Sequence, residues 1–284
     1  MKRYIYTLFT VLIATVTFTS CSDDEGTNPG NDSAPAVTLY QYTASRPNNP
    51  DNDIILRLAT NNKTTEVYYL AEKTSEKEAH VASMGESGYM DYVVSNGKKV
   101  DGLSAASTAD VTVVDLYGAY TITAVAVGGN KKTSAETTYT GLEWTDVVTG
   151  TYYYGASPKL IEALGLTSSP TTLQLCTTDA TLYRFKDVFG PGYSLKIKLI
   201  DYTGSDDDGK YQFFRIPATD TPFVYGSHGT VNVRDIGYWQ GNDAFVTEGG
   251  YESGMYGNYN CFIYIQYYVA VGGIDYGYDS FIAD

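Results

Sequence analysis

Short apolar and polar runs alternate along most of the chain after residue 35, and turn residues separate them. Ile54, Leu56 and Leu58 alternate with residues that face the other way, as expected for a half-buried strand. The first half of the chain has six β-rich runs: Val37–Tyr42, Ile54–Ala59, Glu66–Glu72, Val111–Asp115, Tyr120–Val127 and Ser134–Tyr139. Regularly spaced short strands predict a β-sandwich domain.

The second half repeats this pattern with longer runs. Leu195 and Ile197 alternate with Lys196 and Lys198, which indicates one buried and one wet face of an antiparallel sheet. The predicted strands are Gly150–Tyr154, Thr171–Cys176, Thr181–Asp187, Tyr193–Asp201, Tyr211–Ile216, Thr230–Arg234 and Asn260–Val271. The last run is apolar on both faces, which favours a central strand. The predicted fold class is therefore all-β, with two β-sandwich domains, the second an antiparallel sandwich.

Two helical segments interrupt the strands. Ser75 and Glu78 have the spacing of a capping box, and Gly85 is a stop signal, so a helix is expected between Thr74 and Gly85. Pro158–Leu164 has the length of one short helical turn.

The first 35 residues have a different character. Lys2 and Arg3 precede an apolar run, Tyr4–Thr17, which is too short for a transmembrane helix and is typical of a secretion signal. Ser22–Pro35 is polar and reads as a flexible tether. The predicted organisation is a signal peptide at 1–20, a tether at 21–35, and domains at 36–142 and 143–284.

Phe18-Thr19-Ser20-Cys21 resembles a bacterial lipobox, and the acidic run Ser22-Asp23-Asp24-Glu25 resembles the surface-export tag of Bacteroidota lipoproteins. The resemblance implies that Cys21 carries lipid, which would anchor the protein in the outer membrane, facing the cell exterior. The alternative is cleavage by ordinary signal peptidase, which would leave Cys21 as a free thiol.

The first domain resembles fibronectin type III domains. Tyr120-Thr-Ile122-Thr-Ala124-Val-Ala126, followed by Gly128-Gly129-Asn130, is similar to that family's Tyr-x-Val-x-Ala strand and turn. Val67-Tyr68-Tyr69 fits the third strand, whereas the usual tryptophan of the second strand is missing. The resemblance implies a spacer or platform and no particular chemistry.

The second domain is similar to C-terminal domains of uncharacterised Bacteroidota lipoproteins. The similarity rests on Trp144 with Gly150-Thr-Tyr, on Leu182-Tyr183-Arg184-Phe185, and on Tyr267-Tyr268-Val269 with Gly272-Gly273. It implies a family and not an activity.

Composition narrows the function. The chain carries a net charge of −14, which repels the negatively charged phosphates of nucleic acids, so we expect no nucleic-acid partner. His80 and His228 are the two histidines, each expected on the solvated surface, and no motif for nucleophilic or zinc chemistry occurs. The acidic run Asp206-Asp207-Asp208-Gly209 lacks the residue spacing of a calcium-binding loop. It is therefore predicted to form a hairpin turn. We therefore predict no catalysis, no metal and no cofactor.

Cys176 and Cys261 could pair in an oxidising compartment. Cys261 shares the core face of Ile263, whereas Cys176 shares a face with Gln174, so two separate thiols are favoured and a disulfide is the alternative.

Aromatic residues beside glycines are the remaining candidates for chemistry. Tyr238, Trp239, Tyr256 and Tyr259 are the predicted ligand-binding residues, because a flat ring can stack on a sugar while its hydroxyl or indole N–H forms hydrogen bonds. The simpler interpretation is that tyrosine serves only as a strand former. Further turn aromatics are Tyr225, Tyr251, Tyr276 and Tyr278, and the polar candidates near them are Asp235, Asn242 and Asp243.

The function predicted from these residues is non-catalytic binding of a glycan at the cell surface. The alternative is a structural or adhesive surface or pilus-associated protein that contacts other proteins through an exposed edge strand, for which Asn260–Val271 is the candidate.

Overall fold

The computed structural model describes residues 33–237, 247 and 250–284, so Cys21 and the predicted signal peptide lie outside the described residues. The chain divides into two compact units, Met1–Gly141 and Leu142–Asp284. Both are built mainly from antiparallel strands, and the predicted all-β class is confirmed. In the described ranges, no helix combines the length and apolarity that crossing a membrane requires.

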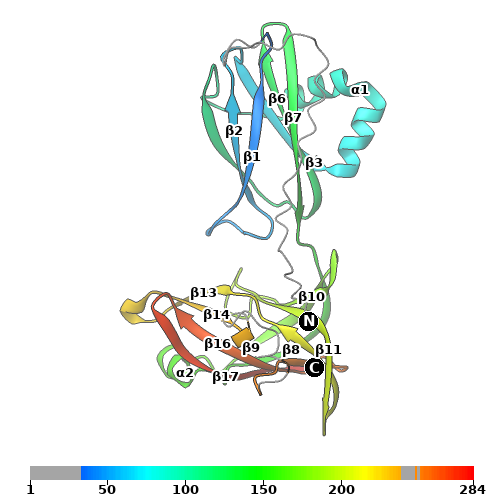
Figure 1. Ribbon diagram of the computed structural model, residues 1–284. Coiled ribbons are helices and arrows are strands. Elements are labelled where there is room, and N and C mark those ends of the chain that lie inside the picture. The colour runs from blue at the N-terminus through cyan, green and yellow to red at the C-terminus, as the bar shows by residue number, and fades with distance from the viewer. Residues whose placement is uncertain (1–32, 238–246, 248–249) are drawn as a thin grey trace, which may run out of the picture. The chain divides into compact units, whose positions relative to one another are not determined.

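Two sheets make up the first unit, with strand orders β1–β2–β5 and β4–β3–β6–β7 (Figure 1). The strands are β1 Val37–Thr43, β2 Ile54–Thr60, β3 Glu66–Lys73, β4 Lys98–Lys99, β5 Thr108–Val113, β6 Gly118–Gly128 and β7 Lys131–Gly141. Leu56 and Leu58 from one sheet and Ile122 and Ala124 from the other are fully buried in one shared core. The alternation predicted in β2 is therefore confirmed.

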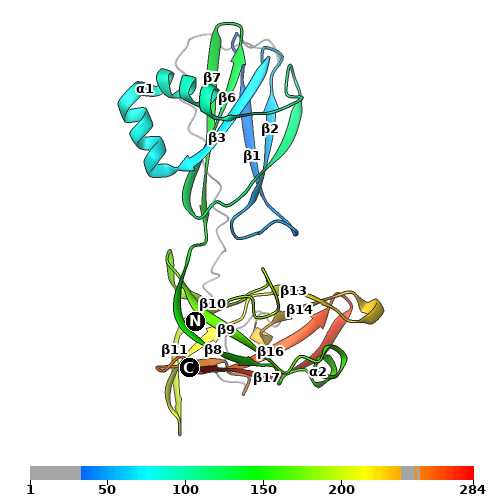
Figure 2. The same ribbon diagram turned by 180° about the vertical axis from the view of Figure 1, so that it is seen from behind.

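Helix α1, Thr74–Asn96, lies against β3, β6 and β7 (Figure 2). The predicted stop at Gly85 is confirmed in part: this residue, at φ 72° and ψ 170°, is not helical, and it divides α1 into two helical segments joined by a kink. The second segment was not predicted, and it packs on the sheet through the buried side chains of Tyr89 and Val93. The predicted capping box is absent, since the helix begins after Lys73 with no side-chain cap.

The prediction of a solvated His80 is confirmed only in part, because its side chain is 32% exposed. Its Nδ1 lies 2.9 Å from Oε2 of Glu72, a buried carboxylate of β3, and its ring packs 4.5 Å from the ring of Tyr92. The other oxygen of Glu72 accepts a hydrogen bond from the hydroxyl of Tyr89. His80 thus helps to hold α1 on the sheet.

The second unit contains one ten-stranded antiparallel sheet, in the order β13–β14–β16–β15–β12–β11–β10–β9–β8–β17. Because β17 pairs with β16 as well as with β8, this sheet closes on itself around a core. The strands are β8 Trp144–Tyr153, β9 Ser168–Cys176, β10 Asp179–Phe185, β11 Leu195–Asp206, β12 Gly209–Arg215, β13 Thr219–Val224, β14 Thr230–Arg234, β15 Gly254–Tyr256, β16 Cys261–Val269 and β17 Gly272–Ala283.

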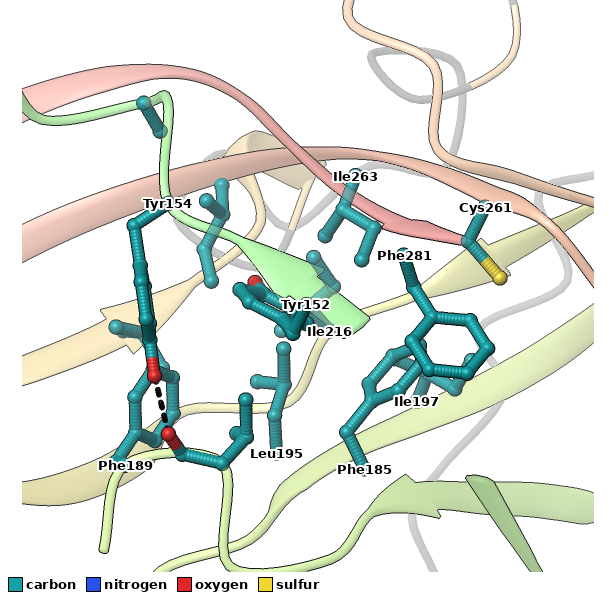
Figure 3. Close-up of a cluster of buried hydrophobic side chains, with 14 of the residues drawn as sticks. Tyr152, Tyr154, Phe185, Phe189, Leu195, Ile197, Ile216, Cys261, Ile263 and Phe281 are labelled. Carbon is teal, nitrogen blue, oxygen red and sulfur yellow. Dashed lines mark hydrogen bonds between the residues drawn. The ribbon is translucent and has the colours of Figure 1, made fainter. Parts of the chain in front are cut away.

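Large aromatic side chains fill this core (Figure 3). The ring of Phe185 lies 5.5 Å from that of Tyr152 and 5.0 Å from that of Phe281, so β8, β10 and β17 meet in one cluster. Tyr154 donates its hydroxyl hydrogen to the carbonyl of Val188. A buried aromatic cluster of this kind supplies much of the hydrophobic stabilisation of a small domain.

Helix α2, Pro158–Leu164, has the predicted bounds. Ser157 caps it by accepting a hydrogen bond from the backbone N–H of Leu160, and Gly165 ends it in the left-handed conformation. The predicted strand Asn260–Val271 is a central strand, as expected, but it ends at Val269, where a tight turn leads into β17. Val271, 81% exposed at this turn, makes the turn look like strand in the sequence.

Asp279 of β17 is almost completely buried and accepts four hydrogen bonds. Its Oδ2 accepts from the hydroxyls of Tyr152 (2.8 Å) and Tyr267 (2.6 Å), on the two strands that flank β17. Its Oδ1 accepts from the backbone N–H groups of Gly155 (2.7 Å) and Ala156 (2.8 Å), just before α2. Burial raises the pKa of Asp279, and the four donors act in the opposite direction.

Both described cysteines are buried and free, so the predicted separate thiols are confirmed. Cys261 lies in the core, and burial raises the pKa of its thiol. Cys176 lies elsewhere, with its Sγ 3.3 Å from the hydroxyl oxygen of Thr178.

We predict that Asp279→Asn destabilises the second unit. An amide offers one acceptor oxygen to four donors, and each unsatisfied buried group costs about 1–3 kcal/mol, so we expect a loss of roughly 3 kcal/mol in unfolding free energy. Both tryptophans, Trp144 and Trp239, belong to this unit, so tryptophan fluorescence during urea denaturation reports on it alone. The matched control is Asp201→Asn, on the exposed part of β11. A loss no larger than that of the control would contradict this role for Asp279.

A second prediction concerns acid stability. Hydrogen bonds from Lys198 and then from Thr181 lower the pKa of Asp179 from 3.8 to about 2. A carboxyl with a lowered folded pKa stabilises the fold above pH 3.8 and loses that contribution as the pH falls towards 2. Asp179→Asn should therefore cost stability at neutral pH, by less than about 1 kcal/mol for a pair this exposed, and this cost should shrink as the pH falls through 2. Urea denaturation of both proteins across this range measures the difference, and a pH-independent difference would contradict the assignment.

Candidate functional site

The structure describes two of the four predicted ligand-binding residues. Tyr256 ends β15 and Tyr259 lies in the β15–β16 turn, and both line the same hollow. Tyr238 and Trp239 lie outside the described residues and stay predictions.

The hollow measures about 390 Å³ and opens where β10, β11, β12 and β15 meet the β15–β16 turn. Tyr183, Leu199 and Met255 also pack on the hydrophobic core, so the site rests on rigid elements. The polar side chains at the hollow are those of Thr203, Lys210 and Gln212. Rings combined with a few polar groups are the usual lining of small-molecule sites.

The β11–β12 hairpin forms one wall of the hollow. Asp206 pairs with Gly209 across a two-residue turn, and the backbone N–H of Asp208 donates to the carboxylate of Asp206 (3.0 Å). This confirms the hairpin interpretation of the acidic run. The same carboxylate accepts a 2.5 Å hydrogen bond from the hydroxyl of Tyr256, which fixes that ring at the rim.

The β15–β16 turn also lines the hollow, through Gly257 and Tyr259. Tyr259 adopts the left-handed conformation at φ 67°, which is uncommon for a residue with a large side chain. Two hydrogen bonds hold it there: the N–H of Tyr259 donates to the carbonyl of Tyr256, and the N–H of Tyr256 donates to the carbonyl of Asn260, each at 2.9 Å. The ring of Tyr259 remains 37% exposed.

Two glycines make room for the ring of Tyr211 in β12. A Cβ at Gly204 would lie 2.4 Å from this ring, and a Cβ at Gly254 would lie 2.7 Å from it. The ring therefore lies flat over two neighbouring strands, with its centroid 5.6 Å from that of Tyr256. Aromatic cover over glycine is a known way to stabilise strands that lack side chains.

Three tyrosines at the hollow, Tyr183, Tyr211 and Tyr256, remain protonated hydrogen-bond donors at neutral pH. Burial is the main cause of the raised pKa of Tyr183, Tyr211 and Tyr256. The charge of Glu252 adds to this for Tyr211, and the hydrogen bond to Asp206 adds to it for Tyr256. The hollow thus presents neutral rings and hydroxyls together with the ammonium group of Lys210, and the carboxylate of Asp206 lies beside Tyr256.

Tyr183 and Tyr211 are site residues that the sequence did not indicate, because a tyrosine inside a strand looks the same whether it supports the fold or lines a site. Tyr276 and Tyr278 were expected in turns but lie in β17, 65% and 46% exposed. Their spacing of two residues was the signal that could have placed them on one strand face.

Asp235 is wrongly predicted as a group that could accept sugar hydroxyls. It is fully buried, and its carboxylate accepts bonds from Arg215 (2.8 and 3.1 Å) and from the N–H of Ile216 (2.5 Å). Asn242 and Asp243 lie outside the described residues. His228 is exposed in a short 3-10 turn, Gly226–His228, and stacks on Tyr225. In the described ranges, no three His, Cys, Asp or Glu side chains gather as a metal site would require.

No protein-family model matches the chain, and no curated protein matches it. One matching solved structure is a Kfla1895 mutant in complex with cyclobis-(1→6)-alpha-nigerosyl, with 12% identity and a TM-score of 0.22. The match covers 82% of this chain and 29% of that chain, so this chain spans less than a third of its length. A TM-score this low supports neither a shared fold nor a shared ligand.

We predict that Gly204→Ala displaces the ring of Tyr211 and destabilises the second unit by about 1–3 kcal/mol, the usual cost of overpacking. Gly257→Ala is the matched control at the same hollow, because a Cβ there would meet nothing within 4 Å. Urea denaturation followed by tryptophan fluorescence measures both variants. Equal stability of the two would show that the Gly204–Tyr211 packing contributes nothing.

Proposed function

We propose that the protein is a lipid-anchored outer-membrane protein, facing the cell exterior, whose C-terminal unit binds a glycan without catalysis. The hollow formed by Tyr183, Tyr211, Tyr256 and Tyr259 carries this proposal. Rings stack on the apolar C–H faces of sugars, and neutral phenol hydroxyls with neighbouring carboxylates match sugar hydroxyls. A ligand held in this way needs no cofactor.

The proposed anchor is Cys21, after removal of residues 1–20 as a signal peptide. The apolar run before Cys21 and the acidic run after it support this proposal. The polar residues that follow would then act as a tether between the membrane and the folded units.

We further propose that the first unit is a fibronectin type III-like spacer. A three-stranded sheet opposite a four-stranded sheet supports this, as does the position of the Tyr120–Ala126 motif in β6, between β3 and β7. Platforms of this kind display a binding unit and carry no chemistry of their own.

The adhesive alternative depended on Asn260–Val271 being an edge strand. In the structure β16 pairs with β17 along one side and with β14 and β15 along the other, so its backbone cannot accept a partner strand. Glycan binding is therefore the better supported of the two functions.

The glycan proposal is tested by affinity electrophoresis of the chain Ser22–Asp284 in gels that contain neutral, anionic or cationic polysaccharides. We expect retardation by a neutral polysaccharide, and loss of one ring contact in Tyr259→Ala should weaken it by about fivefold or more. Trp239→Ala tests the predicted residue outside the described ranges. Tyr40→Ala is the control, because Tyr40 is 50% exposed on β1 of the other unit.

Retardation that all three variants share equally with the original chain would place the site elsewhere. Failure of every polysaccharide to retard the protein would overturn the glycan proposal, and protein partners would become the next search.

A further inference from the structure

Further aromatic side chains of the second unit lie next to the hollow, on the outer face of the sheet. Six rings on the outer face of the sheet follow one another in contact, and we name them the aromatic track: Tyr256, Tyr211, Phe262, Tyr278, Tyr264 and Tyr276. Successive centroids lie 5.6, 4.9, 6.4, 4.9 and 6.3 Å apart. The track begins at the rim of the hollow and ends on β17.

Strand register places these rings on one face. Tyr211 pairs directly with Tyr256, and Tyr264 pairs directly with Tyr278. Cys261, Ile263 and Ile265 of β16 point into the core, so the residues between them, Phe262 and Tyr264, point outward.

Exposure of the rings is uneven along the track, and its first three rings, Tyr256, Tyr211 and Phe262, are partly buried. Tyr264 is only 7% exposed and supports its neighbours, whereas Tyr278 is 46% exposed and Tyr276 is 65% exposed. Singly exposed aromatics are ordinary on protein surfaces, but a contiguous row that leads into a hollow is typical of a binding surface.

Charge indicates which ligand fits. The carboxylate of Asp206 is hydrogen-bonded to the first ring of the track, and Glu252 lies close enough to raise the pKa of both Tyr211 and Tyr278. Lys210 in the lining of the hollow carries a positive charge. The two carboxylates, on a chain of net charge −14, outnumber it, disfavour anions and can accept hydrogen bonds from hydroxyl groups.

We infer that the aromatic track binds an extended, uncharged glycan chain that lies across β12, β16 and β17, with one end of the chain in the hollow. This inference rests on the proposed glycan binding and adds the length and the charge of the ligand. Each exposed ring would stack on a successive sugar, so affinity would grow with chain length.

The test compares the disaccharide and the hexasaccharide of the neutral polysaccharide that retards Ser22–Asp284, by isothermal titration calorimetry. Tyr276→Thr and Tyr278→Thr remove a ring while keeping a good strand former. Each should weaken hexasaccharide binding by about fivefold or more and leave disaccharide binding unchanged. Tyr40→Thr is the control in the first unit, and circular dichroism checks that every variant is folded.

Equal affinity for the disaccharide and the hexasaccharide, or unchanged hexasaccharide binding in both variants, would contradict binding along the aromatic track. The binding site would then be limited to the hollow. Tighter binding of a polyuronate than of any neutral polysaccharide would overturn the charge assignment. A dimer in sedimentation that Tyr276→Thr dissociates would show that a second copy occupies the track. Absence of binding to any glycan would overturn the proposed function itself, together with this inference.

Discussion

Strand β17 must pair with two neighbours at once, and the buried carboxylate of Asp279 is the interaction that secures this position. Its oxygens receive hydroxyls from β8 and β16 and two backbone N–H groups from the segment before α2. A buried carboxylate without such partners would be prohibitively costly, so the four donors and the closed sheet require one another. Because Asp279 faces inward, the residue before it in the strand, Tyr278, must face solvent. One interaction thus sets both the closure of the sheet and the direction of its exposed rings.

Glycine is the second requirement of the proposed site. The ring of Tyr211 occupies space that side chains at Gly204 or Gly254 would take, and it contacts Tyr256 and Phe262 because it lies flat there. Glycine within a strand normally weakens the strand, and the ring that covers it restores apolar contact. The abundance of both glycine and tyrosine in this chain is explained, at these positions, by pairwise packing rather than by separate preferences for turns and strands.

Local pattern predicted much of the fold. Helix α2 and strand β14 have the predicted bounds, because proline and serine fix the start of one and alternation fixes the other. Pattern failed where distant contacts decide: a second helical segment follows the break at Gly85, because its Tyr89 and Val93 pack on the sheet. Strand β13, which contains Pro222 at the edge of the sheet, has no clear alternation and was missed. Of the residues that line the hollow, the sequence predicted only Tyr256 and Tyr259, which have turn residues beside them. Tyr183 and Tyr211 lie inside strands, where the local sequence does not distinguish a site residue from a strand former.

The two interpretations of the tyrosines, as strand formers and as ligand contacts, therefore apply to different residues of the same surface. Tyr264 is almost completely covered and packs against three other tyrosine rings, so its contribution is to stability. Tyr276 is largely uncovered, and an exposed ring adds little to folding, so its face is available to a ligand. In the aromatic track the buried rings are fixed by packing and the exposed rings are accessible to a ligand, so the surface is rigid before a ligand binds. A pre-organised surface lowers the entropic cost of binding a flexible chain. This rigidity is what an extended glycan would require of a shallow site.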